Sequence, residues 1–420
     1  MMTEIGEIPE EWRIQRLTEL ASITSGNTAP QDRKYFKNGL YPFIRVHHLN
    51  DLESGKYLKN FDLINHEAIS ELKLKVFKKD SIIFPKSGES IKLERRALLS
   101  RDSFVANHLA VIDTNGKNVN TLFLFYYLSS LRTSDFLSKT TMPSLNLSII
   151  KQFPIPFPPL PEQQKIAEIL STADETIQKV NEEINLTEKL KKGLMQTLLT
   201  RGIGHTKFKM TEIGEIPEEW RNEKISKLGQ IITGGTPSTS EPAYWNGEIP
   251  WIASGDVHQR YIKMARKSIT QEGYLKSNCN LLPIGTVLIA LNGQGKTRGL
   301  SAILDIEAVC NQSMAGIIPK RDILNSVYLL YHLLNRYAEI RNISGIGRNG
   351  LNLEHIGNIV ISCPPLIEQE KIAEIISTID NKMLLLGHKK ERLERLKKGL
   401  MGDLLTGKVR VKINTSKGED

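Results

Sequence analysis

The chain has 420 residues, too many for one ordinary core, so we expect two domains with connecting structure between them. Its 56 Lys and Arg against 47 Asp and Glu leave a formal charge of +9, which favours a polyanionic partner. Three cysteines without C-x-x-C spacing (Cys279, Cys310 and Cys363) argue against a disulfide framework and a thiolate zinc site. The acidic start lacks a signal-peptide layout, and no apolar run reaches the roughly 18 residues needed to cross a bilayer. We therefore expect a soluble, cytoplasmic protein.

The chain opens with a phrase that it later repeats. MTEIGEIPEEW occupies Met2–Trp12 and returns at Met210–Trp220. A second repeat joins PPL, EQ and KIAEI after Pro158 to the same letters after Pro364, and LKKGLM follows each copy. The sequence therefore predicts an A-B-A′-B′ plan, with a first lobe at 1–157, a helix at 158–205, a second lobe at 206–363, a second helix at 364–406 and a tail at 407–420.

Each lobe mixes short strand-like and helix-like runs. DSIIF (Asp80–Phe84) and GTVLIAL (Gly285–Leu291) read as corresponding strands, 205 positions apart. Each is followed by a polar loop that contains glycine, KSGESIK (Lys86–Lys92) in the first lobe and NGQGKTR (Asn292–Arg298) in the second. We expect similar α/β scaffolds that carry different loops.

The two B segments follow a period of seven, which is the spacing of a coiled coil. In each copy eight of the ten seam positions are apolar. A helix over Glu162–Leu199 would be about 55 Å long, and Gly202 and Gly407 are natural stop signals. The expected interhelix seam contains Ile166, Leu170, Ile177, Val180, Ile184, Leu194, Ile372, Ile376, Ile379, Met383, Leu386 and Leu400.

The links at both ends of the second lobe are short, so the two helices run antiparallel if the ends of that lobe lie close together. The expected fold class is α+β, with two mixed α/β lobes held apart by two long antiparallel helices under an approximate two-fold axis. Gly193 and Gly399 interrupt the helices at equivalent places, where glycine costs about 1 kcal/mol relative to alanine. The expected reason is the close approach of another helix or a bend, with a remnant of duplication as the alternative.

The sequence contains no complete catalytic or nucleotide-binding motif of the kinds considered below. ALNGQGKT (Ala290–Thr297) resembles a phosphate-binding loop but has alanine where G-x-x-x-x-G-K-[ST] requires its first glycine. The nine histidines form no H-E-x-x-H, and His47 and His48 read as ordinary strand residues. We therefore predict no catalytic residue and no metal or cofactor in this chain.

The lobe loops contain the side chains that read base edges. Arg and Lys pair with guanine, Asn and Gln with adenine, and Ser and Thr with either. Most polar loop residues are only solvated, so the set carries more weight than any member. The candidates are Asn27, Arg45, Lys86, Ser87, Lys92, Arg95, Arg96 and Asn146 in the first lobe, and Thr236, Ser254, Asn292, Gln294, Lys296, Arg298, Arg348, Asn349 and Asn352 in the second.

Taken together, these motifs resemble the specificity subunit of type I restriction-modification systems. The likeness rests on the A-B-A′-B′ plan, GEIPEEW at both lobe starts, ITGGTPSTSEPAYWNGEIPWIASGDV (Ile232–Val257), LNL before PPLIEQEKIAEII, and LKKGLM. It implies that each lobe is a target recognition domain for half of a split DNA sequence, and that the helices set the spacing and dock two methyltransferase subunits. The first lobe departs at Ser25-Gly26-Asn27 and Arg45-Val46-His47, which implies a different half-site.

The resemblance also implies partners and cofactors. Restriction and translocase subunits would complete the complex, and S-adenosylmethionine, ATP and magnesium would belong to the partner subunits. On this interpretation the opening phrase is repeated because two copies of one partner must meet the same surface. The alternatives are a two-headed protein adaptor without DNA specificity and, more remotely, a nucleotide-dependent enzyme.

Overall fold

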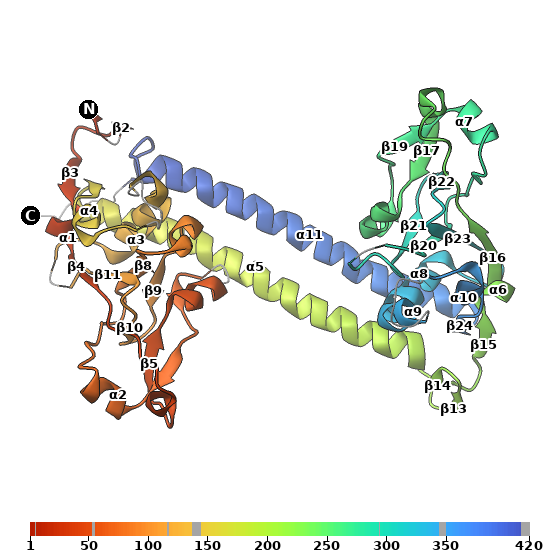
Figure 1. Ribbon diagram of the computed structural model, residues 1–420, viewed down its shortest axis with the longest axis horizontal. Coiled ribbons are helices and arrows are strands. Elements are labelled where there is room, and N and C mark those ends of the chain that lie inside the picture. Colours follow the sequence, from red (N-terminus) through yellow and green to blue (C-terminus); the bar gives the residue numbers. More distant parts are fainter. Residues whose placement is uncertain are drawn as a thin grey trace, which may run out of the picture. The chain divides into compact units, whose positions relative to one another are not determined.

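The computed structural model describes the chain except Ile5, 53–54, Gly116, 137–143, Gln294, 344–349 and 413–420. It divides into two compact units: unit 1 is Met1–Glu183 with Leu386–Asp420, and unit 2 is Ile184–Leu385. Each unit holds one lobe and part of both long helices (Figure 1). Within the described part of the chain, no helix combines the length and the apolar character that a membrane crossing requires.

The lobe of unit 1 is built on three small sheets and a separate antiparallel pair of strands, β1 and β2. Five strands pair in the order β4-β11-β8-β9-β6, three in the order β10-β5-β7, and β12 pairs with β3. The strands are β1 (Met2–Thr3), β2 (Gly6–Glu7), β3 (Arg13–Arg16), β4 (Ser22–Ser25), β5 (Tyr41–Ile44), β6 (Tyr57–Leu58), β7 (Asp62–Ile64), β8 (Ile82–Pro85), β9 (Ala97–Leu99), β10 (Phe104–Val105), β11 (Leu109–Asp113) and β12 (Pro154–Phe157). The short helices are α1 (Leu17–Leu20), α2 (His66–Glu71), α3 (Thr121–Ser130) and α4 (Leu147–Lys151), with 3-10 helices η1 (Arg33–Phe36), η2 (Val46–Asp51), η3 (Glu89–Leu93) and η4 (Thr133–Phe136).

The lobe of unit 2 repeats this topology strand for strand. Its sheets have the orders β16-β23-β20-β21-β18, β19-β17-β22 and β15-β24. The strands are β13 (Phe208–Thr211), β14 (Gly214–Pro217), β15 (Arg221–Lys224), β16 (Gly229–Thr233), β17 (Trp245–Ile252), β18 (Tyr261–Ile262), β19 (Lys267–Ile269), β20 (Val287–Ala290), β21 (Ser301–Leu304), β22 (Val309–Cys310), β23 (Met314–Pro319) and β24 (Val360–Cys363). The short helices are α6 (Ile225–Leu228), α7 (Gln271–Leu275), α8 (Ser326–Asn335), α9 (Tyr337–Asn342) and α10 (Leu353–Gly357), with η5 (Pro242–Tyr244) and η6 (Ser254–Gln259).

The predicted long helices are α5 (Leu160–Arg201) and α11 (Leu366–Leu404). Each has proline near its start, where no intrahelical N–H is needed. Gly202, which follows α5, and Gly407, beyond α11, take positive φ angles of 67° and 73°, a conformation that glycine adopts without strain. The strands predicted at Asp80–Phe84 and Gly285–Leu291 appear as β8 and β20.

Within each unit the two long helices run antiparallel, as predicted. In unit 1 the start of α5 packs with the end of α11, because Ile166 and Leu170 share a core with Leu404. In unit 2 the end of α5 packs with the start of α11, because Leu198 shares a core with Ile372. Every expected seam residue is buried or half-buried. The outer seam positions also pack on the lobe, so the seam is shared between the partner helix and the lobe core.

Two of the lysines that break the apolar heptads are explained by ion pairs. Lys191 of α5 lies 2.5 Å from Asp380 of α11 in unit 2, and Lys397 of α11 lies 2.5 Å from Asp174 of α5 in unit 1. A lobe tyrosine joins each pair: Tyr331 donates to Asp380 at 2.7 Å and Tyr126 donates to Asp174 at 2.6 Å. Each polar node therefore ties one lobe to both helices. A buried polar pair of this kind fixes the register of a helix pair.

The repeated opening phrase has a structural role beside the partner surface predicted for it, because its tryptophan is buried although most of its residues are exposed. Trp12 and Trp220 are 1% and 0% exposed, and each donates its indole N–H to a glutamate at the start of the following helix, Glu162 or Glu368, at 3.0 Å. Both copies therefore make the same contact with the following helix. We name the two arrangements the helix sockets.

Each helix socket also holds the end of the other long helix. In unit 2 the backbone N–H of Ile203 donates to Glu368, and a Cβ added to Gly202 would lie 2.6 Å from Trp220. In unit 1 Arg410 donates to Glu162 at 2.7 Å, and a Cβ added to Gly407 would lie 2.4 Å from Pro9. Glycine is therefore required sterically as well as for its φ angle. The link 201–205 in unit 2 and the segment 407–410 in unit 1 have equivalent positions.

The prediction that a helix approaches Gly193 and Gly399 closely is wrong for the described residues. A Cβ added at either position would meet nothing within 4 Å, and both residues are exposed. The leucines that open the same repeated phrase, Leu190 and Leu396, are 55% and 58% exposed.

A buried histidine makes the stability of unit 2 dependent on pH. His332 of α8 lies 3.1 Å from Ser362 through Nε2, and burial, with a contribution from the Arg336 cation, lowers its pKa to about 3. Between pH 6.5 and about 3 the unfolded chain takes up a proton that the folded chain does not. The stabilisation is therefore complete above pH 6.5 and falls as the pH falls, by at most about 1.4 kcal/mol per pH unit.

We expect His332→Tyr, which installs the residue that unit 1 has at the equivalent Tyr127, to remove this contribution. Urea unfolding of the full chain at pH 7.0, 6.0 and 5.0 measures it as the difference between wild type and variant. Identical pH slopes for the two proteins would contradict the assignment.

Candidate nucleic-acid interface

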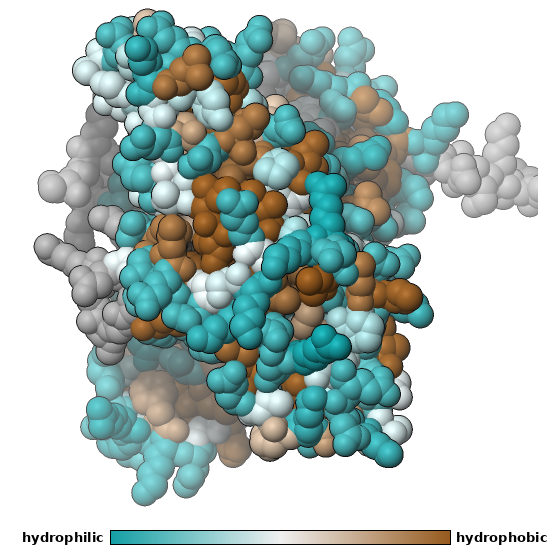
Figure 2. Space-filling view, turned by 90° about the vertical axis from the view of Figure 1, so that its right-hand side faces the viewer, coloured by the Kyte–Doolittle hydropathy of each residue, from teal (hydrophilic) through white to brown (hydrophobic). Residues whose placement is uncertain are grey.

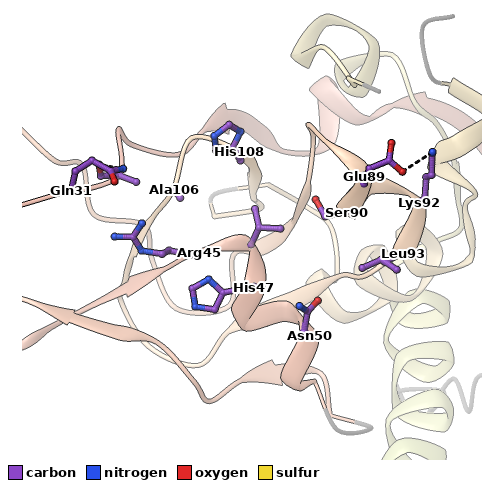
Figure 3. A pocket seen from close by; sticks show the side chains of 12 residues that line it. Gln31, Arg45, His47, Asn50, Glu89, Ser90, Lys92, Leu93, Ala106 and His108 are labelled. Carbon is purple, nitrogen blue, oxygen red and sulfur yellow. Dashed lines mark hydrogen bonds and ion pairs between the residues drawn. The ribbon is translucent and has the colours of Figure 1, made fainter. Parts of the chain in front are cut away.

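The lobe of unit 1 contains a hollow of about 790 Å³ at the place where η2 faces the loop after β8, and its wall combines apolar side chains such as Val46 and Leu93 with polar ones. Arg45, His47 and Asn50 enter it from the residue before η2 and from η2 itself, and Glu89 and Lys92 enter it from η3 (Figure 3). Gln31 and His108 complete the polar lining. Guanidinium, ammonium, amide and imidazole groups therefore line one concave surface, which is the chemistry that reads base edges.

Arg45 is held in place by the lobe before any ligand arrives. Its Nε donates to Asp62 at 2.7 Å, and its Nη2 donates to the Pro30 carbonyl at 2.7 Å. The guanidinium also lies over the rings of Phe36 and Phe43, at 5.6 and 5.5 Å from their centroids. These contacts fix both the plane and the direction of the group at the edge of the hollow.

His48 closes the turn that presents Arg45. Its Nδ1 accepts the backbone N–H of Arg45 at 2.9 Å, which satisfies the first turn of η2. Burial lowers the pKa of His48, with a smaller effect of His47, and the ring is thus held neutral with Nδ1 as an acceptor. In unit 2 Asp256 performs the same function by accepting the N–H of Ala253 at 3.0 Å.

His47, His48 and Asp62 form a grouping whose ligand atoms lie within 4.8 Å of one another in the described part of the lobe. The donor set does not fit a cation. His48 Nδ1 already accepts from Arg45, its Nε2 lies 3.5 Å from Asp62, and the Arg45 guanidinium already occupies the Asp62 carboxylate. The grouping therefore serves to position Arg45.

The structure brings two predicted residues of the first lobe, Arg45 and Lys92, into this hollow. Lys92 pairs with Glu89 at 2.7 Å. Ser87 lies next to the hollow, because its Oγ is 2.7 Å from Nδ1 of His108. Lys86 is half-buried, and Asn146 is exposed at the start of α4.

Three other predicted residues of the first lobe use their polar groups inside the lobe. The Asn27 amide donates to the Lys75 carbonyl at 2.8 Å and accepts the Lys75 N–H at 2.7 Å. Arg96 has a side chain only 2% exposed and pairs with Glu94, and Arg95 donates to Asn50. We therefore remove Asn27 and Arg96 from the proposed base contacts and retain Arg95 only as a support for Asn50.

In unit 2 the equivalent region joins η6 to the loop after β20. His258 of η6 lies 3.3 Å from the hydroxyl of Thr297 in that loop. The predicted Ser254 begins η6, and Asn292 and Lys296 are exposed in the loop, where Arg298 is half-buried. Gln294, Arg348 and Asn349 lie outside the described residues.

Two predicted residues of the second lobe have structural partners. Asn352 caps α10 by accepting the His355 N–H at 2.7 Å, and Thr236 donates to Gln312. Sequence reasoning missed Gln31, Asn50 and His108 in the first lobe and His258 in the second. Their positions in the hollow depend on pairings between strands far apart in the chain, although the alternation of glycine-bearing loops and short polar segments does indicate the region.

Comparison with known proteins identifies the family. The model of the type I restriction modification DNA specificity domain matches residues 9–188 and 217–395. The MjaVIII type I restriction enzyme specificity subunit of Methanocaldococcus jannaschii is 29% identical over 417 residues, which covers 96% of this chain and 94% of the relative. The EcoR124I/EcoR124II specificity subunit of Escherichia coli is 28% identical over 241 residues, covering 55% of this chain and 56% of the relative.

Solved structures share the fold. The type I restriction-modification S subunit from M. genitalium gives a TM-score of 0.60 at 15% identity, covering 95% of this chain and 96% of that chain. A chain from a study of the assembly and conformational transition of the type I restriction-modification system gives 0.55 at 19% identity, covering 96% and 100%. With a family model that spans both lobes and both helices, this chain belongs to the family of type I restriction-modification DNA specificity subunits.

Proposed function

We propose that each lobe of this specificity subunit reads one half of a bipartite DNA target through the region where its 3-10 helix faces the loop after the central strand. The carrying observation is the hollow in unit 1, whose lining includes the hydrogen-bonding side chains of Arg45, Asn50 and Gln31. The formal charge of +9 supports a polyanionic ligand.

The two lobes share a frame and differ at the proposed reading positions, which supports two different half-sites. β5 pairs with β7 in the same register in which β17 pairs with β19, so Phe43 and Asp62 correspond to Trp251 and Lys267. Arg45, two residues after Phe43, therefore corresponds to Ala253. Similar frames with different polar side chains are what two distinct base sequences require.

Exposed apolar groups that occur twice support the docking of two copies of one protein partner. Leu190 and Leu396 lie in the repeated LKKGLM phrase, are more than half exposed, and stand beside the open glycines Gly193 and Gly399. On the face of unit 2 that Figure 2 presents, hydrophobic side chains gather near the centre with polar residues around them. Exposed apolar areas of this kind mark protein contacts, and in our proposal methyltransferase subunits cover the helices.

The remaining partners follow from the same proposal. Restriction and translocase subunits complete the complex, and the chemistry that needs S-adenosylmethionine, ATP and magnesium takes place on the partner subunits. The specificity subunit itself contributes target choice and no catalytic group. Its place of work is the cytoplasm, where host DNA is methylated.

Exchange of residues 1–157 for the first lobe of another family member should change one half of the methylated target and leave the other half unchanged. The physical reason is that each lobe has its own core and its own loops. Mapping methylated adenines in cells that carry the assembled system measures the result. A change in both halves would contradict modular reading.

DNA binding by the same complex should also weaken with salt, by about 0.9 log units per log unit of salt for each phosphate neutralised. Binding that is independent of salt would favour a protein adaptor over a DNA reader.

A further inference from the structure

We propose that Arg45 recognises a guanine in the half-site of lobe 1, and that Asp62 is the positioning residue that aims it. The inference rests on the DNA-reading function proposed above. It names the base class that one side chain of the hollow selects.

The Arg45 guanidinium keeps N–H donors that the lobe does not use. Arginine has five N–H groups, of which Nε–H is used by Asp62 and one Nη2–H by the Pro30 carbonyl. Both N–H groups of Nη1 and the second of Nη2 remain. Arg45 lines the hollow, so in our proposal these remaining donors face the ligand.

The environment of Arg45 suits a base better than a phosphate. A guanidinium that is already paired with a carboxylate has little net charge to offer a phosphate, but it keeps the planar pair of donors that matches O6 and N7 of guanine. The side chain is 24% exposed and lies over two aromatic rings, so its conformational freedom is already restricted. A fixed planar group suits a base edge, whereas a phosphate contact tolerates a mobile ammonium.

The side chains around Arg45 in the hollow are mostly uncharged or already paired. In Figure 3, Gln31 and His47 lie on the same side of the hollow as Arg45, and Glu89 and Lys92 lie on the opposite side. Lys92 is neutralised by Glu89 at 2.7 Å. Hydrogen-bonding groups rather than unpaired charge therefore surround the guanidinium, as expected where base edges are read.

Lobe 2 has neither the arginine nor the carboxylate at the equivalent positions. At the positions of Arg45 and Asp62 lobe 2 has Ala253 and Lys267, and Lys267 lies over the rings of Trp245 and Trp251. Lobe 2 therefore keeps a cation, the Lys267 ammonium, over the aromatic residue equivalent to Phe43, but it has no planar guanidinium there. The guanine contact at this position is thus specific to the half-site of lobe 1.

The test maps methylated motifs in cells that carry the assembled system with Arg45→Ala, Arg45→Lys or Asp62→Asn. We expect a G·C pair in the lobe 1 half-site of the wild type. Preference for that pair should fall about 10- to 100-fold in Arg45→Ala and Arg45→Lys, while the lobe 2 half-site stays unchanged. Asp62→Asn should give a smaller loss at the same position, because the base contact survives with poorer aim.

Lys78→Ala is the matched control, since it removes one exposed cation of the same lobe outside the hollow. It should leave all positions of the motif unchanged. Retained preference in Arg45→Lys, a uniform loss across all sequences in Arg45→Ala, or a wild-type half-site without a G·C pair would each overturn the proposal. Failure of the proposed function is distinguishable, because the lobe exchange would then leave the lobe 1 half-site unaltered.

Discussion

Replacement of Asp380 by alanine should lower the free energy of unfolding of unit 2 by about 3–5 kcal/mol, the usual loss when one partner of a buried ion pair is removed. Lys191 and Asp380 have side chains only 13% and 10% exposed, so the ammonium left behind would lose its counter-ion in a largely water-free site. Tyr331 would lose its acceptor as well. Chemical denaturation of the full chain, with amide hydrogen exchange on α8, measures the loss.

The double variant Lys191→Met with Asp380→Leu should recover much of this stability, because apolar residues of similar size replace the buried pair. Arg260 also pairs with Asp380, but its side chain is 38% exposed and water can solvate it. A loss in the double variant as large as in Asp380→Ala would show that packing, and not the uncompensated charge, causes the effect. The sign with pH is fixed by Asp380: burial raises its pKa, but hydrogen bonds from Lys191 and Tyr331 outweigh burial and lower it. The stabilisation is therefore present above the ordinary value of 3.8 and is lost as the pH falls below it.

Trp220→Ala should destabilise unit 2 by about 3–5 kcal/mol, the range found for large aromatic residues truncated in cores. The ring is fully buried, and its loss would open the helix socket around Glu368 and Gly202. Trp220→Phe keeps most of the apolar contact and removes only the N–H donor to Glu368, so we expect a smaller loss of about 1–3 kcal/mol. Urea midpoints of the three proteins measure the series.

Trp245→Ala is the matched control for this series, because Trp245 is a half-buried tryptophan of the same lobe that does not belong to the helix socket. Its loss should be clearly smaller than that of Trp220→Ala. Equal losses would mean that the helix socket contributes no more than an ordinary aromatic contact of the lobe.

The long helices and the repeat could be predicted from the sequence because their signals are local. A period of seven and a fixed offset are visible without knowledge of any distant contact. The strands at β8 and β20 were predicted for the same reason, as short apolar runs followed by glycine-bearing loops.

The helix sockets could not be predicted, because Trp12 and Glu162 are brought together across 150 residues of chain. The site residues fall between these cases. Residue type made Arg45 a candidate, and the structure places it in the hollow. Residue type could not distinguish an amide free to read bases from that of Asn27, which is used by the backbone of Lys75. The lysines at 191 and 397 look like defects in a heptad until the aspartates of the opposite helix are known.

The helix sockets have a consequence for how new target choices arise in this chain. Each lobe is bordered by the same two residues, a buried tryptophan before it and a glutamate at the start of the helix after it. The glutamate also binds the segment that follows the other long helix. A gene segment that moves from one lobe position to the other carries the bordering tryptophan and glutamate with it. Recombination within the repeats can therefore exchange lobes, while the long helices need no compensating substitution.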